Sequence, residues 1–97
     1  MSKVNGSKLD VNVEVFIIKE GEVFVSYCPA LDLASQGDSF DEAVQAFDEA
    51  LDIFFEEITE MGTLDDVLKD CGWKKVQKHW EPPLVVGQTQ RTFHIPA

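Results

Sequence analysis

The sequence predicts an α+β fold in which a small antiparallel sheet carries a long amphipathic helix on one face. Two patterns predict it: residues 9–28 alternate between apolar and polar side chains as strands do, and residues 39–62 repeat apolar side chains at helical spacing. Glycines separate the segments. The expected order of elements is β-β-β-α-α-β.

The first two strands are expected to form a hairpin. Apolar side chains alternate along the first strand at Leu9, Val11, Val13, Val15 and Ile17. Glu20-Gly21 is expected to be its two-residue turn, because glycine adopts the positive φ that such turns require. A turn at this place would pair Ile17 with Phe24 and Val15 with Ser26.

Both faces of this hairpin are substantially apolar. One face can pack on the helix, while the opposite face carries Phe16, Ile18, Val23, Val25 and Tyr27. An apolar face of this size must meet either the C-terminal segment or another subunit. We therefore assign these five residues to self-association and expect a homodimer or a higher oligomer.

The long helix is expected to begin after Ser39. Ser39 is its N-cap, and Glu42 three residues later completes a capping box. Gly62 is expected to end it as the C′ residue. Its buried side is expected to carry Phe40, Ala43, Val44, Phe47, Ala50, Leu51, Phe54, Phe55 and Ile58.

A short loop and a brief third strand are expected between the hairpin and this helix, with Gly37 serving a turn. After the helix, Thr63 is expected to cap a second one that runs to about Asp70 and stops at Gly72. The predicted core is Val11, Val13, Val15, Ile17, Phe24, Ala43, Val44, Phe47, Ala50, Leu51, Phe54 and Ile58.

The whole chain, residues 1–97, is expected to form one domain. Residues 1–8 are a flexible polar arm, and residues 74–97 are a C-terminal extension that contains Pro82-Pro83. Thr89 to Ile95 alternate in polarity, which predicts a final strand.

The charge balance indicates which classes of partner the protein can bind. The chain has 18 acids against 8 bases, a formal net charge of -10, and Lys69 is the one base between Asp38 and Asp70. Such a surface repels phosphate backbones, so direct nucleic-acid binding is disfavoured. It attracts a basic protein and speeds the encounter.

The outer side of the long helix is the candidate partner-binding surface, formed by Asp48, Glu49, Asp52, Ile53, Glu56 and Glu60. Ile53 is an apolar side chain among acids, as partner contacts often are. Two other interpretations remain open. The acids can simply be a solvated face that aids solubility, and the second helix or Trp73 can fold over Ile53.

No catalytic, metal or cofactor site is expected, and we predict that the protein is not an enzyme. Cys28 and Cys71, with His79 and His94, match no zinc pattern and no nucleophile–base arrangement. A metal-dependent nuclease needs carboxylates that converge on Mg²⁺. Asp10 and Glu14 are the only such pair on the first strand, and the helix acids face away from the sheet.

A nucleic-acid-binding module is the third function class. Its evidence is one small cluster of bases and aromatics, made up of Trp73, Lys74, Lys75, Lys78 and Trp80. No stretch is apolar enough to span a membrane, and no secretory signal is visible, so the expected location is the cytoplasm.

An ordered set of motifs resembles the HicB-like antitoxin domain. These are Tyr27–Leu33, whose loop contains Pro29, then Gln36-Gly37-Asp38-Ser39 and Glu42-Ala43. Gly62-Thr63-Leu64 and the stretch from Leu68 to Gly72-Trp73 are similar to the stand-alone members. The resemblance covers about residues 9–75.

The resemblance implies a partial RNase H-like fold without nuclease chemistry. It also implies a partner, a small basic ribonuclease toxin of the HicA-like type, whose active surface the antitoxin covers. Many relatives append a DNA-binding segment, but the prolines and strand-like end of residues 74–97 predict none here. The alternative is an orphan, self-assembling scaffold of the same fold.

Overall fold

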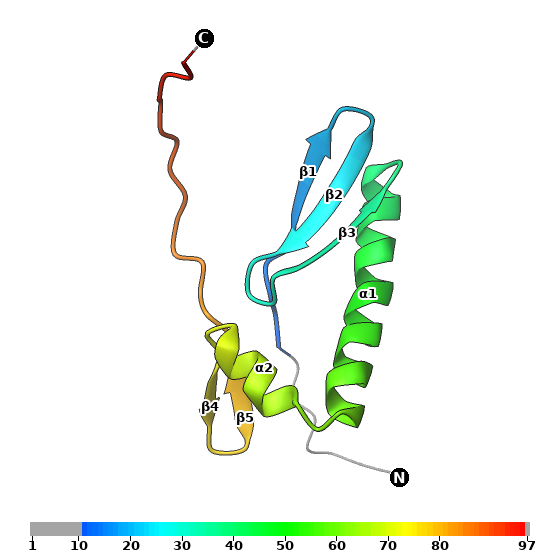
Figure 1. The fold of residues 1–97 in the computed structure, drawn as a ribbon, viewed down its shortest axis with the longest axis vertical. Helices are drawn as coiled ribbons and strands as arrows, with labels where there is room; N and C mark the ends of the chain where they lie inside the picture. Colours follow the sequence, from blue (N-terminus) through cyan, green and yellow to red (C-terminus); the bar gives the residue numbers. More distant parts are fainter. Residues whose placement is uncertain (1–10, 97) are drawn as a thin grey trace.

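A computed structural model describes residues 11–96, so the predicted arm 1–8, Leu9 and Asp10 lie outside the described residues (Figure 1). The elements are β1 (Phe16–Glu20), β2 (Val23–Cys28), β3 (Leu33–Gly37), α1 (Phe40–Glu60), α2 (Leu64–Asp70), β4 (Lys74–Val76) and β5 (His79–Glu81). The α+β class and the order of three strands, two helices and terminal β structure are confirmed.

The three long strands form one antiparallel sheet in the order β1-β2-β3. Glu20 pairs with Val23, so the turn is Gly21-Glu22, with Gly21 at φ 62. Ile17 therefore pairs with Ser26, and the predicted pairing with Phe24 is wrong. Glycine takes the first central position because a type II′ turn requires positive φ there. The strand register differs from the predicted one by two residues. Side chains alternate between the faces with a period of two, so every side chain keeps its predicted face.

Local chemistry determines both ends of α1. At its start, the N–H of Glu42 donates to Ser39 Oγ at 3.1 Å, and the carboxylate of Glu42 accepts from the N–H of Asp38 at 3.1 Å. At its end, Gly62 has φ 70 and the N–H of Thr63 donates to the Ile58 carbonyl at 2.9 Å. This is the Schellman pattern, which gives two of the last carbonyls partners. The predicted boundaries are confirmed.

Gly37 is required for space, contrary to the expected turn role. Its φ is not positive, but a Cβ at this position would lie 2.6 Å from the backbone nitrogen of Ala43. Only a residue without a side chain lets the end of β3 approach the first turn of α1 this closely.

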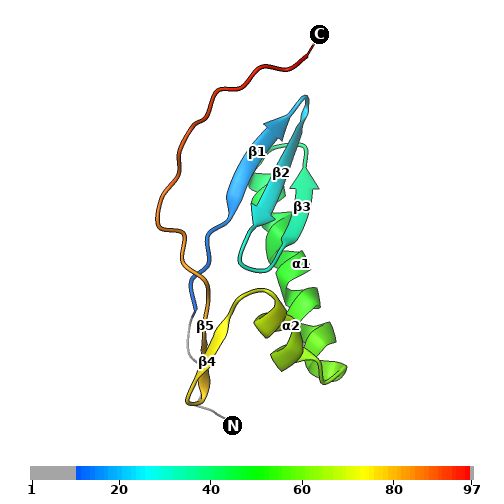
Figure 2. The same ribbon diagram turned by 60° about the vertical axis from the view of Figure 1, so that its left-hand side comes forward.

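The helix α1 covers one face of the sheet (Figure 1, Figure 2). Ala43 and Phe47 are buried against it, with Phe47 only 2% exposed. The buried hydroxyl of Ser26 on β2 donates to the Ala43 carbonyl at 2.9 Å. This bond gives the buried hydroxyl a partner, and it fixes the position of α1 along the sheet.

A second group of contacts joins the loop after β2 to α2. Trp73 is buried, and its indole N–H donates to the Ala30 carbonyl at 2.7 Å. The buried cluster consists of Cys28, Ala30, Leu31, Phe47, Leu68 and Trp73. Among these, Phe47 is the one that the sequence predicts as core.

Three further expectations are wrong. Val11 and Val44, predicted as core, and Phe40, predicted on the buried side of the helix, are exposed, because the apolar stripe of α1 and the first strand extend beyond what a narrow sheet covers. Thr63 makes no side-chain cap on α2, because its hydroxyl donates to the Ile58 carbonyl at 3.5 Å. Residues 89–95 form no strand, since nothing described pairs with them, and the terminal β structure is the hairpin of β4 and β5.

Replacement of Phe47 by Ala should lower the free energy of unfolding by about 3–5 kcal/mol, because it leaves a cavity between α1 and the sheet. Val44→Ala on the same helix is the control, and it should change stability by less than about 1 kcal/mol because Val44 is 37% exposed. Urea unfolding followed by circular dichroism measures both. A near-normal midpoint for Phe47→Ala would refute this helix register.

Candidate protein-binding surfaces

The predicted partner-binding residues form one exposed surface on α1. We call it the acidic surface of α1, and it consists of Asp48, Glu49, Asp52, Ile53, Glu56 and Glu60, all of them exposed. Ile53 is 59% exposed. Neither α2 nor Trp73 covers it, so that alternative explanation of Ile53 is wrong.

Within residues 11–96, no cation lies within ion-pair distance of the carboxylates of this surface. The ion pairs among residues 11–96 are Lys75 with Asp65 at 3.4 Å and His79 with Glu81 at 3.9 Å, and neither involves α1. The last turn of α1 also contains no base. Nothing in the described part of the chain therefore neutralises these charges.

The spacing of the acids makes them repel one another. Asp48, Asp52, Glu56 and Glu60 follow at intervals of four, which places them in one row along the helix. Like charges at this spacing destabilise a helix by about 0.2–0.5 kcal/mol per pair. Glu56 and Glu60 also lie near the negative end of the helix dipole. The row therefore works against the stability of α1.

The predicted self-association residues lie on the sheet face that α1 leaves uncovered. Phe16 and Ile18 are exposed, and Val23, Val25 and Tyr27 are half-buried. Ser26 and Cys28, which alternate with them on β2, are fully buried toward α1. We call this the uncovered sheet face. At the end of this face nearest the β2–β3 loop, Tyr27 donates a hydrogen bond to Asp32 at 3.0 Å, which raises the pKa of the phenol above its ordinary value.

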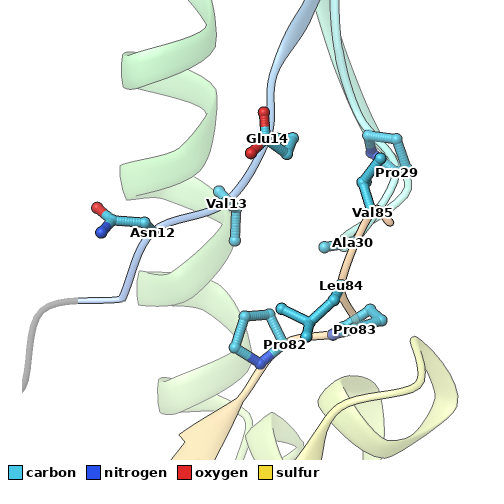
Figure 3. A pocket seen from close by; sticks show the side chains of 9 residues that line it. All are labelled: Asn12, Val13, Glu14, Pro29, Ala30, Pro82, Pro83, Leu84 and Val85. Carbon is cyan, nitrogen blue, oxygen red and sulfur yellow. The ribbon is translucent and has the colours of Figure 1, made fainter. Parts of the chain in front are cut away.

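A cavity of ≈ 290 Å³ lies where the C-terminal segment leaves the body (Figure 3). Residues 12–14, Pro29, Ala30 and residues 82–85 line it. Val13, Pro82 and Leu84 face the cavity, whereas the amide of Asn12 points away from it. Glu14 is the one ionisable residue of the lining, so the cavity lacks the converging polar groups that a ligand site needs.

The other predicted groups do not come together as a site. Within residues 11–96 no three His, Cys, Asp or Glu residues are placed to hold a metal ion. Of the carboxylate pair considered for a nuclease, Asp10 lies outside the described residues and Glu14 lines the apolar cavity. Cys28 is fully buried.

The basic-aromatic cluster is dispersed. Trp73 is buried in the core, and Lys75 lies 3.4 Å from Asp65 and 5.5 Å from the centre of the Trp80 ring. Lys74 and Lys78 remain exposed on the β4–β5 hairpin. The cluster thus offers neither a free aromatic platform at Trp73 nor a free charge at Lys75 for a nucleic acid.

Comparison with protein-family models, with curated proteins and with solved structures gives no match. In the part of the chain that the structure describes, no helix combines the length and the apolar character needed to cross a membrane.

The sequence interpretation missed one exposed group. Leu84, Val86, Phe93 and Ile95, all in the C-terminal segment, are largely exposed apolar residues. The available signal was the apolar run at residues 84–86 and the placement of Phe93 and Ile95 on either side of His94, in a stretch, residues 82–97, that contains no Asp or Glu.

Cys71 should react slowly with iodoacetamide in the folded protein. Burial raises the pKa of its thiol, so less of it is thiolate at pH 8 than in a free cysteine. Its Sγ also lies 3.8 Å from the Leu31 carbonyl. Mass spectrometry of the alkylated protein, with an unfolded sample as control, measures the rate. Modification of folded Cys71 at the rate of the unfolded chain would contradict this.

Proposed function

We propose that this protein is an antitoxin-type binding protein, HicB-like in its sequence pattern, that neutralises a small basic ribonuclease toxin by covering its active surface. The observation that carries the proposal is Ile53, 59% exposed, with Glu49 four residues before it and Glu56 three residues after it on α1, where the carboxylates have no cation beside them in the described chain. The protein acts by occupying its partner, in the cytoplasm, without catalysis or a cofactor.

The charges support a basic partner. A solvated face needs only mixed charge to remain soluble, whereas this one is uniformly negative and destabilises its own helix. Lysine or arginine side chains of a partner would relieve that repulsion on binding. The same charges would speed the encounter, and would do so less at high salt.

The exposed side chain of Ile53 favours binding of a protein partner over simple neutralisation of the carboxylates by dissolved ions. Its side chain would be buried in an apolar pocket surrounded by cations, and full burial of an isoleucine contributes about 1.5–3 kcal/mol. An apolar anchor within a charged rim is the usual arrangement of an interface centre.

A second candidate function is that of an orphan scaffold, favoured by the uncovered sheet face. Phe16 and Ile18 are exposed apolar side chains on the same face as Val25 and Tyr27. We propose that two copies associate through this face, as a homodimer or within a higher oligomer. Self-association and toxin binding use different surfaces, so both can operate in one protein.

A pull-down from lysate of the source cells tests the toxin proposal, at low and at moderate salt. The bait is the native chain, beside Ile53→Glu and the control Phe40→Glu, which adds the same charge at a similarly exposed position, 55% exposed, at the start of α1. The native chain and the control should capture a small basic protein at low salt. Moderate salt and Ile53→Glu should abolish the capture.

The captured protein is then purified and assayed for RNA cleavage. Addition of the native chain should inhibit cleavage at an equimolar ratio, and Ile53→Glu should not. The proposal would be contradicted if Ile53→Glu captured as much of the protein as the native chain does. It would also be contradicted if the native chain left the RNA cleavage by the captured protein unchanged. Recovery of the bait alone would favour the orphan scaffold.

A further inference from the structure

The C-terminal arm, residues 84–95, is extended and exposes its apolar side chains. Phe93 is 77% exposed and Ile95 is 78% exposed. The radius of gyration is 16.6 Å, against roughly 12–13 Å for a compact chain of this length. Only the start of the arm, residues 84–88, lines pockets with the body of its own chain, and Phe93 and Ile95 remain exposed.

The start of the arm is held away from the sheet of its own chain. Pro82 and Pro83 restrict the backbone where it leaves the cavity beside Val13 and Ala30. Residues 85–88 then pass an open groove beside Glu14 and Phe16. Beyond that point the arm rises along the β1 side of the sheet and stays apart from it in both views (Figure 1, Figure 2).

The same chain carries a place for such an arm. β1 is an edge strand, paired with β2 on one side and with no described strand on the other. An unpaired edge presents backbone N–H and C=O groups to which an extended segment can add. Phe16 and Ile18 lie on this strand, two residues apart and on the uncovered sheet face.

Charge also matches the arm to the body of the protein. All 18 acids precede residue 82, whereas the arm contains Arg91 and His94 and no acid. Glu14 lies two residues before β1, and Glu20 is the last residue of β1. The acidic body of a second copy therefore attracts the arm, which carries no negative charge.

We propose that the arm of one copy adds as a strand to the free edge of β1 in a second copy, and that the exchange is reciprocal. Phe93 and Ile95 have the same two-residue spacing as Phe16 and Ile18, so the two pairs can lie side by side on the uncovered sheet face. A two-fold axis lets each copy supply one arm and one edge. The inference rests on the self-association proposed above and does not involve the acidic surface of α1.

Sedimentation equilibrium of three full-length chains tests the exchange. The first is the native chain and the second is Phe93→Glu with Ile95→Glu. The third, Gln88→Glu with Gln90→Glu, adds the same charge to the opposite side of the arm. Because Phe93 and Ile95 are exposed in the single chain, their replacement leaves the monomer folded. The dimer Kd should rise about 100-fold or more in the second chain and by less than tenfold in the control.

Isotope-filtered nuclear Overhauser spectra of a mixed labelled and unlabelled sample identify whose arm is bound. Contacts of Phe93 and Ile95 with Phe16 and Ile18 should join different copies. Three results would each overturn the exchange. The contacts could lie within one copy, or the native chain could stay monomeric at millimolar concentration. The third is an equal dimer Kd for the native and the Phe93→Glu/Ile95→Glu chains. Toxin capture by the Phe93→Glu/Ile95→Glu chain tests the acidic surface of α1 independently of the arm exchange.

Discussion

The packing of α1 against one face of the three-stranded sheet is the contact on which the rest of the structure depends. Gly37 lets the first turn of the helix approach β3, Ser26 donates to its backbone at Ala43, and Phe47 fills the space between the layers. A single helix covers only one face. The opposite face of the sheet, with Phe16 and Ile18, is consequently exposed. The outer side of the helix is exposed as well.

These two exposed regions differ in chemistry, which is why we assign them different partners. The uncovered sheet face is apolar and lies beside a free strand edge, so it suits another strand. The acidic surface of α1 is charged around the single apolar side chain of Ile53, so it suits a basic protein. One small domain can carry both surfaces because Trp73 and the loop at Ala30 extend the buried cluster around Phe47 and stabilise the chain away from either surface.

Local chemistry made much of the fold predictable. Ser39, Glu42 and Gly62 define α1 through short-range hydrogen bonds, and strand alternation placed Phe16 and Ile18 on the correct face even though the turn was misplaced. The exposed positions of the acidic surface followed from helical periodicity alone. The contact between Trp73 and Ala30 was not predictable, because it joins residues 43 apart in the chain and no local pattern encodes it. The alternation of Thr89 to Ile95 predicts a strand, but the described chain offers it no partner.

The claim that α1 carries its carboxylates for binding is tested most directly by the stability of a chain that lacks them. Urea unfolding at low salt compares the native chain with Asp52→Asn/Glu56→Gln, which removes the like-charge neighbours in the middle of the row. The account predicts that this variant unfolds at a higher urea concentration and that added salt narrows the difference. A variant that is less stable than the native chain would show that the carboxylates support folding, and would contradict the account.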